Sequence, residues 1–248
     1  MTDNYSAPLP ACSLTVIIPT LKEKDNLNFI ASALHHNLKE IPYEVLFVDD
    51  CSQDGTVEIC EDLSRKWPIR LIVRPGSPCL SKAVLTGFLN ARGTYLIVMD
   101  ADMSHPASAV PIMLADLKRG ADLVIGSRYI RGSRIEPSWG RGRLWHSLLA
   151  VGLTSPLVKV KDPMSGFFGV RRGALPPITQ LHPRGFKILL ELLVKGEFPK
   201  IVEIPISFQN RSYGKSKLKL KQQVISLLQI VKLYLYKISR SRLLGGRS

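Results

Sequence analysis

The sequence predicts a doubly wound α/β domain built on a mostly parallel sheet. Five continuous apolar blocks occur in the first half of the chain, at residues 14–18, 44–48, 69–73, 95–99 and 123–125. Segments with apolar residues at helical spacing lie between them, at residues 26–38, 54–65, 82–91 and 108–118. Apolar strands that alternate with helices are typical of parallel sheets covered on both faces. We expect Pro19 to end the first strand.

The second half of the chain is less regular. Residues 128–142 are rich in Gly, Arg and Ser and predict a mobile loop. A helix from about Leu144, a strand at 166–170, a helix at 186–194 and a strand at 200–207 are expected to follow. No internal repeat or Pro/Ser-rich linker divides the chain. We therefore expect one main domain of residues 1–220 and a C-terminal segment of residues 221–248.

The charge is strongly positive and uneven. The 248 residues include 34 Lys and Arg against 20 Asp and Glu, a net charge of +14, and no acidic residue follows Glu203. Basic and apolar residues alternate there, which favours an amphipathic helix from about Gln222 that lies on an anionic membrane surface, with Lys232, Lys237 and Arg240 toward the headgroups. Residues 224–238 are too short and too often interrupted to span a bilayer.

Composition also bears on nucleic-acid binding and on the cellular compartment. A nucleic-acid-binding protein would suit the charge, but only 7% of the residues are aromatic and acidic clusters follow the strands, so no nucleic-acid partner is expected. The four cysteines show no metal-type spacing and are interpreted as reduced thiols. The first residues are polar and Pro-rich, unlike a secretory signal. We therefore expect a cytosol-facing compartment.

Acidic residues follow the predicted strands at the edge where parallel sheets bind ligands. Asp100 and Asp102 follow the fourth strand, and in an extended segment both carboxylates face the same way. Such a pair suits Mg²⁺ or Mn²⁺ shared with diphosphate oxygens, although two solvated turn aspartates are the simpler alternative. Asp50 follows the second strand and is placed to contact a nucleobase or ribose. Asp54 is either part of that site or an N-cap.

Four motifs, VDDCSQDGT, MDADMSHP, SGFFGVRR and RSYGKSKL, occur in that order. Together they resemble the polyprenyl-phosphate glycosyltransferases of glycosyltransferase family 2, which have the GT-A fold, and among these the dolichol-phosphate mannose synthases. The resemblance covers roughly residues 13–240. It implies inverting transfer of mannose from GDP-mannose to a dolichyl or polyprenyl monophosphate, with GDP as the leaving group. It also makes residues 1–220 the catalytic domain and residues 221–248 the membrane-associating segment.

On the donor side, the resemblance implies that the nucleotide sugar is bound by three groups of residues. The first group is the loop after the first strand, the second is the acidic strand ends, and the third closes over the diphosphate. They are Pro19, Thr20 and Glu23; Asp50, Asp100, Ala101 and Asp102; and Arg211 and Lys217. Asp100 and Asp102 match the metal-associated residues, and Ser104 stands where some members have a metal-contacting Gln.

On the acceptor side, the resemblance implies that Arg128, Arg143 and Ser147 surround the lipid phosphate. Asp102, Arg128 and Arg143 are then the catalytic residues. A lipid phosphate is already anionic, so no general base is needed, and His105 is expected to be an ordinary loop residue. Direct displacement by the phosphate oxygen inverts the anomeric carbon and gives a β-linked product.

The sequence departs from the family pattern in two places. Leu21 and Lys22 replace a usual Tyr-Asn pair, and residues 76–81 replace a Gly-Lys-x-Gly-Leu-Gly stretch. Two alternatives therefore stay open: another donor, such as UDP-glucose, and a catalytically weak regulatory subunit. The resemblance also implies the cytosolic face of a membrane, the endoplasmic reticulum in a eukaryote or the plasma membrane in a prokaryote, and small membrane-anchoring subunits as additional partners.

Overall fold

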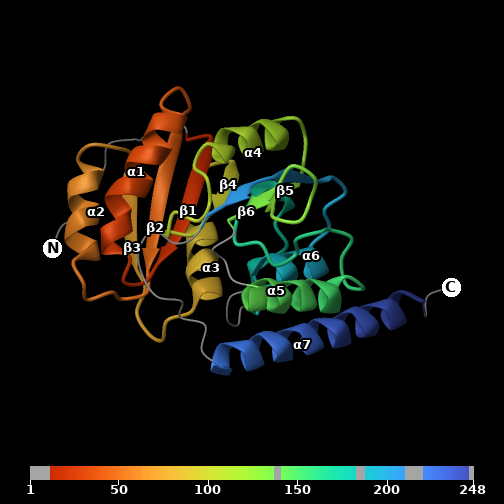
Figure 1. Cartoon of the computed structure of the whole chain (residues 1–248). Helices are drawn as coiled ribbons and strands as arrows, with labels where there is room; N and C mark the ends of the chain where they lie inside the picture. The colour runs from red at the N-terminus through yellow and green to blue at the C-terminus, as the bar shows by residue number, and fades with distance from the viewer. Residues whose placement is uncertain (1–11, 137–140, 183–187, 210–219, 246–248) are drawn as a thin grey trace.

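A computed structural model describes the chain at residues 12–136, 141–182, 188–209 and 220–245. Side chains are described at residues 12–136, 148–182, 188–209 and 227–240. The chain folds around a central sheet with helices on both faces, and two further helices, α5 and α7, run along one side (Figure 1).

The central sheet has seven strands in the order β3-β2-β1-β4-β7-β5-β8. From one edge to the other they are Ile69–Val73, Tyr43–Asp49, Leu14–Thr20, Tyr95–Val98, Phe168–Arg171, Leu123–Ser127 and Ile201–Pro205. Only β7 is antiparallel to its neighbours, β4 and β5, in this sheet. Strands β6 (Arg134–Ile135) and β9 (Ser207–Phe208) form a small parallel pair. The predicted doubly wound, mostly parallel sheet is therefore confirmed.

Apolar residues at helical spacing direct the helices onto the sheet. Helices α1 (Lys24–Leu38), α2 (Thr56–Ser64) and α4 (Ala109–Lys118) cover one face, and α3 (Leu80–Asn90) and α6 (Ile188–Lys195) cover the other. In α1, Leu27, Ile30 and Leu34 recur every three or four residues and are fully buried. Each such side chain contributes roughly 1.5–3 kcal/mol of transfer free energy. Two short 3₁₀ helices, Arg172–Ala174 and Ile178–Gln180, follow β7.

Helices α5 (Arg141–Thr154) and α7 (Leu220–Gly245) pack beyond α6 (Figure 1). Ile230 and Leu233 of α7 are buried in a cluster that includes Leu190 of α6. The expected helix near Gln222 is therefore present and begins at Leu220. None of the described helices is both long enough and apolar enough to cross a membrane.

Two of the basic residues of α7 that were expected to face headgroups also contact the domain. The Nζ of Lys237 donates to the carbonyl oxygens of Pro156 and Leu157, at 3.2 and 2.7 Å. Arg240 pairs with Glu197 at 2.6 Å. Both side chains therefore have partners in the domain while they remain accessible, as does Lys232. Their orientation toward lipid headgroups stays a prediction.

Two local expectations also need correction. The first strand continues through Pro19 to Thr20, because the register of β1 with β4 ends at Ile17 and no ladder donor is required on that side afterwards. The expected loop at residues 128–142 contains β6, which pairs with β9, and α5 begins at Arg141 rather than near Leu144. Pairing between strands far apart in sequence stabilises β6 and leaves no signal in its composition.

Candidate active site

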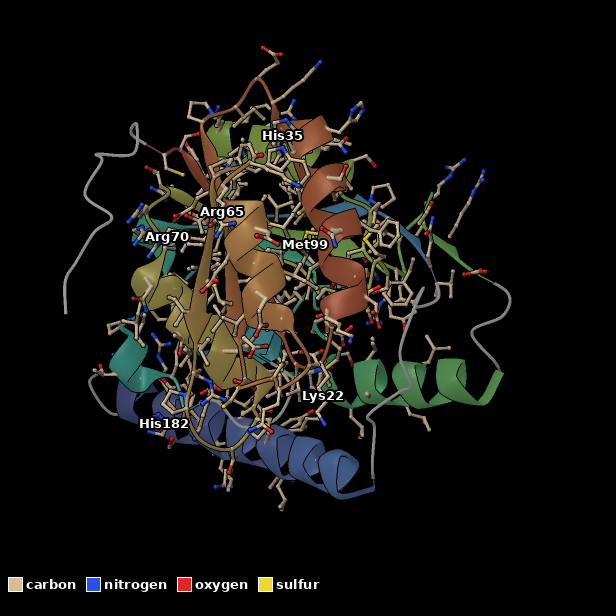
Figure 2. All side chains as sticks on the ribbon, turned by 90° about the vertical axis from the view of Figure 1, so that its left-hand side faces the viewer. Lys22, His35, Arg65, Arg70, Met99 and His182 are labelled. Carbon is tan, nitrogen blue, oxygen red and sulfur yellow. The ribbon has the colours of Figure 1, made fainter. Side chains whose placement is uncertain are left out.

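The carboxyl ends of β1, β2 and β4 meet at one edge of the sheet, here called the carboxyl edge. In register, Thr20 of β1 lies beside Asp49 of β2, and the acidic motif follows β4. Figure 2 shows Lys22, which follows β1, on the side toward α7, whereas His35 at the end of α1 lies at the opposite end. The three acidic or polar strand ends expected from the sequence are therefore brought together.

Backbone strain is concentrated in the loops of the carboxyl edge. Lys22, Cys51 and Met103 are the non-glycine residues with positive φ in the described chain, with φ of 54°, 58° and 63°. They follow β1, β2 and β4, respectively. A left-handed conformation at a residue with a Cβ costs about 1–2 kcal/mol. Such strain is commonly retained where a loop must present groups to a ligand.

Side-chain hydrogen bonds hold the end of β1 and the loop that follows it. The Thr20 hydroxyl donates to Asp49 Oδ1 at 3.1 Å, and Glu23 Oε2 accepts from Asn26 Nδ2 at 2.8 Å. Asn26 is buried, and its Oδ1 accepts no hydrogen bond from the described residues. Pro19 lies inside β1. The loop residues expected to bind nucleotide thus lie at the carboxyl edge, with the Thr20 side chain turned to Asp49.

Asp50 lies just beyond β2 and is buried against Arg74, which follows β3. Its Oδ1 accepts from Arg74 Nε at 2.7 Å and forms an ion pair with Nη2 at 2.5 Å, and its Oδ2 accepts from the Cys79 amide at 2.6 Å. Burial raises the pKa of Asp50 even though the Cys79 amide and Arg74 act to lower it. The carboxylate is therefore fixed in orientation at the place where the sequence predicts contact with the base or ribose.

The acidic motif is a bend instead of an extended segment. Strand β4 ends at Val98, residues 101–103 form a bend and Met103 is left-handed, so the extended conformation expected from Asp100 to Asp102 is not observed. Asp102 is buried, and its Oδ1 accepts from the Ser104 hydroxyl at 2.6 Å and amide at 3.1 Å. The Asp102 carboxylate and the Ser104 hydroxyl, both predicted metal ligands, are therefore in direct contact.

Asp100 lies against the SGFF motif. A Cβ built on Gly166 would come within 3.2 and 3.3 Å of the two Asp100 carboxylate oxygens. The Asp100 amide donates to Nδ1 of His105 at 3.1 Å. His105 is buried and stacks on Phe167, with centroids 5.0 Å apart. His105 lies in a loop, as expected, but its ring is buried and contacts the SGFF motif.

Arg128, which follows β5, forms a buried ion pair. Its Nε and Nη2 each donate to the Asp162 carboxylate at 2.8 Å, and the Asp162 side chain is fully buried. The guanidinium also lies over the rings of Tyr129 and Phe208, 5.2 and 5.5 Å from their centroids. Burial acts to lower the pKa of Arg128, but the hydrogen bonds and charge of Asp162 outweigh it and the pKa is raised. The guanidinium is a permanently charged group.

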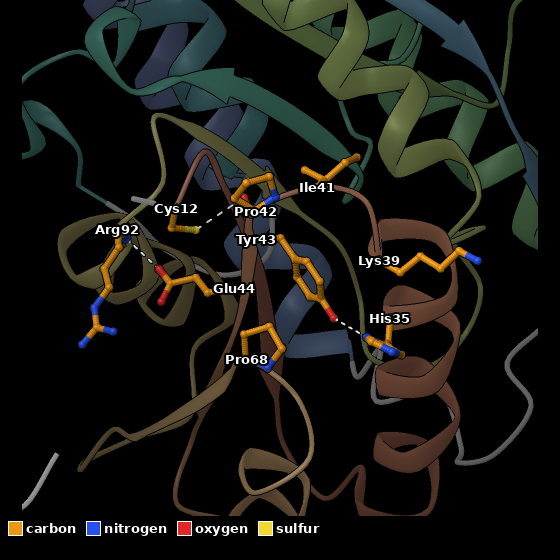
Figure 3. A pocket seen from close by; sticks show the side chains of 9 residues that line it. All are labelled: Cys12, His35, Lys39, Ile41, Pro42, Tyr43, Glu44, Pro68 and Arg92. Atoms are coloured by element: carbon orange, nitrogen blue, oxygen red, sulfur yellow. Dashed lines mark hydrogen bonds between the residues drawn. The ribbon is translucent and has the colours of Figure 1, made fainter. Parts of the chain in front are cut away.

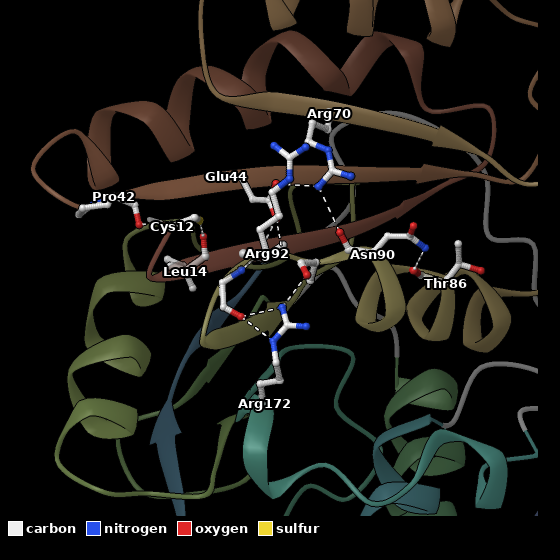
Figure 4. Close-up of polar contacts among 12 residues, drawn as sticks. Cys12, Leu14, Pro42, Glu44, Arg70, Thr86, Asn90, Arg92 and Arg172 are labelled. Atoms are coloured by element: carbon white, nitrogen blue, oxygen red, sulfur yellow. Dashed lines mark hydrogen bonds and ion pairs between the residues drawn. The ribbon is translucent and has the colours of Figure 1, made fainter. Parts of the chain in front are cut away.

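The opposite, amino edge of the sheet contains a pocket of about 280 Å³ (Figure 3). Its walls include Cys12, His35, Tyr43 and Glu44. Glu44 is buried in a hydrogen-bond network that joins Arg70, Thr15 and the Arg92 amide (Figure 4). Because the pocket lies away from all the predicted site residues, we assign the chemistry to the carboxyl edge instead.

A sequence model described as Glycosyl transferase family 2 matches residues 15–178. The chain belongs to glycosyl transferase family 2. It is 37% identical over 241 residues to a dolichol-phosphate mannosyltransferase of Saccharomyces cerevisiae, covering 93% of this chain and 90% of that protein. It is 34% identical to a polyprenol monophosphomannose synthase of Mycolicibacterium smegmatis, covering 84% of this chain and 82% of that protein.

A further relative is longer than this glycosyltransferase. The dolichol-phosphate mannosyltransferase of Pyrococcus furiosus is 41% identical over 210 residues, which cover 83% of this chain but 59% of that protein. The chain therefore spans less than two thirds of that relative. Among solved structures, glucosyl-3-phosphoglycerate synthase of Mycobacterium tuberculosis with Mn²⁺, UDP-glucose and glycerol 3-phosphate has a TM-score of 0.64 at 18% identity, covering 91% of this chain and 80% of that chain. This likeness concerns the fold, which is of the GT-A type.

The residues of the acidic motif fit a divalent cation. Their ligand atoms are carboxylate and hydroxyl oxygens, which hard cations prefer, and the missing side chain at Gly166 leaves room beside the Asp100 carboxylate. Within the described parts of the chain, no group of three or more His, Cys, Asp and Glu side chains is gathered as metal ligands. A cation here would therefore need ligands from a bound diphosphate as well.

Some predicted site residues of the glycosyltransferase cannot be compared with this geometry. Arg143 and Ser147 lie on α5, but their side chains are outside the described ones, and Arg211 and Lys217 lie outside the described residues. Sequence reasoning also missed Arg74, Asp162 and the contact of His105 with the Asp100 amide. The position of Arg74 directly after β3 was a usable signal, because β3 is next to β2 in the sheet. The pairing of Asp162 with Arg128 had no local signal.

Proposed function

We propose that the chain transfers mannose from GDP-mannose to a dolichyl or polyprenyl monophosphate, with inversion at the anomeric carbon. The names of relatives that align over most of the chain support this reaction. The observation that carries the proposal is that Asp100, which lies against Gly166, and the buried Arg128–Asp162 pair are at the same edge of the sheet. The charge of Asp100 acts on Arg128 there. Anionic and cationic groups held so close suit a metal–diphosphate donor beside a phosphate acceptor.

Asp100 and Asp102 would hold Mg²⁺ or Mn²⁺, with Ser104 supporting Asp102 through its hydroxyl. When bound, the cation supplies Lewis-acid stabilisation of the negative charge that develops on the departing diphosphate. Arg211 and Lys217 are assigned to the same diphosphate through the motif resemblance, and Asp50, Pro19, Thr20 and Glu23 to the nucleoside. All of these groups bind or orient the donor.

Arg128, with Arg143 and Ser147, is assigned to the acceptor phosphate. The charge of Arg128 is maintained by Asp162, whose two oxygens fix the plane of the guanidinium. This orientation holds the phosphate in spite of its repulsion from the donor diphosphate. The acceptor oxygen is already anionic and needs no proton acceptor. The reaction then depends on alignment of the two substrates and on charge stabilisation.

The acceptor would reach this edge from a membrane that the protein touches with α5 and α7. Exposed apolar residues gather on these two helices, and their exposed fractions lie between 42% and 61%. They are Leu148, Leu149 and Leu153 on α5, and Leu227, Leu228, Val231, Leu235 and Ile238 on α7. Four of the α7 residues, at positions 228, 231, 235 and 238, recur every three or four residues along one stripe. This stripe and the net charge of +14 favour the cytosolic surface of an anionic membrane.

The transfer reaction is tested with a panel of labelled sugar nucleotides and a short polyprenyl phosphate. We expect GDP-mannose to be the preferred donor, a β-linked lipid product, and loss of transfer on chelation that added Mg²⁺ or Mn²⁺ restores. Preference for UDP-glucose would replace the donor while keeping the site. Absence of transfer from every donor would favour a regulatory subunit instead.

The membrane assignment is tested by vesicle flotation of one double variant and one control variant. Val231→Glu with Leu235→Glu should lower binding to vesicles that contain anionic lipid by about tenfold or more, since it places charge in the apolar stripe. Ile112→Glu, on exposed α4 at the other face of the sheet, is the matched control and should leave binding unchanged. Binding should also weaken with salt. Equal loss in both variants would contradict the assignment.

A further inference from the structure

His105 joins three segments that are far apart in the sequence. Its own loop contains the acidic motif, it stacks on Phe167 of the SGFF motif at an interplanar angle of 16°, and Phe208 of β9 meets it edge-on, 5.6 Å between centroids. His105 is 4% exposed. The two aromatic contacts hold the plane of its ring between Phe167 and Phe208.

The contact with Asp100 joins the ring of His105 to the backbone of the acidic motif. The Asp100 amide donates to Nδ1 of His105 at 3.1 Å, so this nitrogen is the acceptor. Through this bond the ring holds the backbone of Asp100 at the first residue after Met99, where the chain leaves the sheet and begins the bend.

We infer that His105 is a positioning residue, which holds the Asp100 carboxylate in place for the donor's cation through the backbone amide of Asp100. The inference rests on the proposed function, because it concerns the same acidic motif. Gly166 supports it, since a Cβ there would approach His105 Cε1 to 3.4 Å as well as the Asp100 carboxylate. The SGFF motif therefore contacts both partners. Groups that orient metal ligands from outside typically change metal affinity 10–100-fold when removed.

Two substitutions separate the hydrogen bond from the packing. His105→Asn keeps an acceptor oxygen at nearly the position of Nδ1 but removes the ring. His105→Phe keeps the ring between Phe167 and Phe208 but has no acceptor. Mn²⁺ affinity is measured by electron paramagnetic resonance in the presence of GDP, thermal unfolding is measured without either, and kcat and KM for GDP-mannose are measured separately.

We expect His105→Phe to bind Mn²⁺ with GDP at least tenfold more weakly than the unaltered protein while unfolding at a similar temperature. His105→Asn should keep that affinity within about threefold although it unfolds earlier. The reverse order, with affinity following the ring and not the acceptor, would show a packing role and overturn this inference alone. No binding of Mn²⁺ with GDP by the unaltered protein would overturn the proposed function and this inference with it.

Discussion

One buried acidic residue lies near the start of strand β2 and another directly follows the strand, and the two are held differently. Glu44, at the amino edge, pairs with Arg70 of β3 at 2.9 Å and also accepts from Thr15 and the Arg92 amide. Asp50, at the carboxyl edge, pairs with Arg74 just beyond the same neighbouring strand. Both are therefore carboxylate–arginine pairs between adjacent parallel strands.

The difference lies in the backbone around each pair. Glu44 is inside a regular strand, whereas Asp50 is followed at once by the left-handed Cys51. Hydrogen bonds alone thus do not distinguish a structural acid from a site acid in this fold. Backbone strain distinguishes them. Among the described non-glycine residues, positive φ occurs at Lys22, Cys51 and Met103, all at the carboxyl edge.

The largest expected effect is a loss of transfer activity when an acid of the carboxyl edge is replaced, compared with an acid of the amino edge. Asp102→Asn should lower kcat for mannose transfer by about 10²–10³-fold, because one carboxylate charge of the acidic motif is removed. Glu44→Gln should leave kcat within about twofold while lowering the free energy of unfolding by about 1–3 kcal/mol, because a buried pair is weakened. Transfer assays and urea denaturation of both variants provide the test. Loss of activity in Glu44→Gln would break the distinction between the edges.

The next effect concerns the ion pair that supports Arg128. Asp162→Asn should lower the free energy of unfolding by about 3–5 kcal/mol, since it leaves a buried guanidinium without its counter-charge. The KM for the polyprenyl phosphate should rise as well, with KM for GDP-mannose nearly unchanged. Arg240→Gln, which removes the exposed pair with Glu197, is the control and should cost at most about 1 kcal/mol. A change in donor KM alone would contradict the acceptor role.

These examples show how far the sequence allowed prediction. Strand β3 was predicted at its observed bounds, and α1 nearly so, because their patterns are local. The antiparallel orientation of β7 depends on contacts of Phe168 with β4 and β5 and has no local signature. The same holds for the site. Asp100 and Asp102 could be predicted because they directly follow a strand. The pairing of Asp162 with Arg128 could not, because the two residues are 34 positions apart and meet only in the folded chain.

The pH dependence of stability should differ in sign between Asp50 and Asp122, which lies at the amino edge before β5. The hydrogen bond from Arg171 lowers the pKa of Asp122, so its contribution is present above the unfolded pKa, about 4, and is lost as the pH falls through the folded value. Burial raises the pKa of Asp50, so its contribution is largest below about pH 4 and declines as the pH rises through the folded value.

Urea denaturation between about pH 3 and 7 tests this with Asp50→Asn and Asp122→Asn. The stability difference between the unaltered protein and Asp122→Asn should grow with pH. The corresponding difference for Asp50→Asn should shrink with pH. Parallel slopes would mean that Arg74 compensates Asp50 as fully as Arg171 compensates Asp122, and the electrostatic contrast between the edges would then disappear.

The smallest effect measures the strain itself. Cys51→Gly should raise the free energy of unfolding by about 0.5–1 kcal/mol, because relief of the left-handed conformation exceeds the added entropy of the unfolded chain. The exposed Cys51 side chain contributes little packing that would be lost. Ser32→Gly, on the exposed face of α1, is the control and should lower stability by about 0.5 kcal/mol. If both variants lost stability in thermal unfolding, the left-handed turn after β2 would be an unstrained one, and strain would no longer distinguish the carboxyl edge.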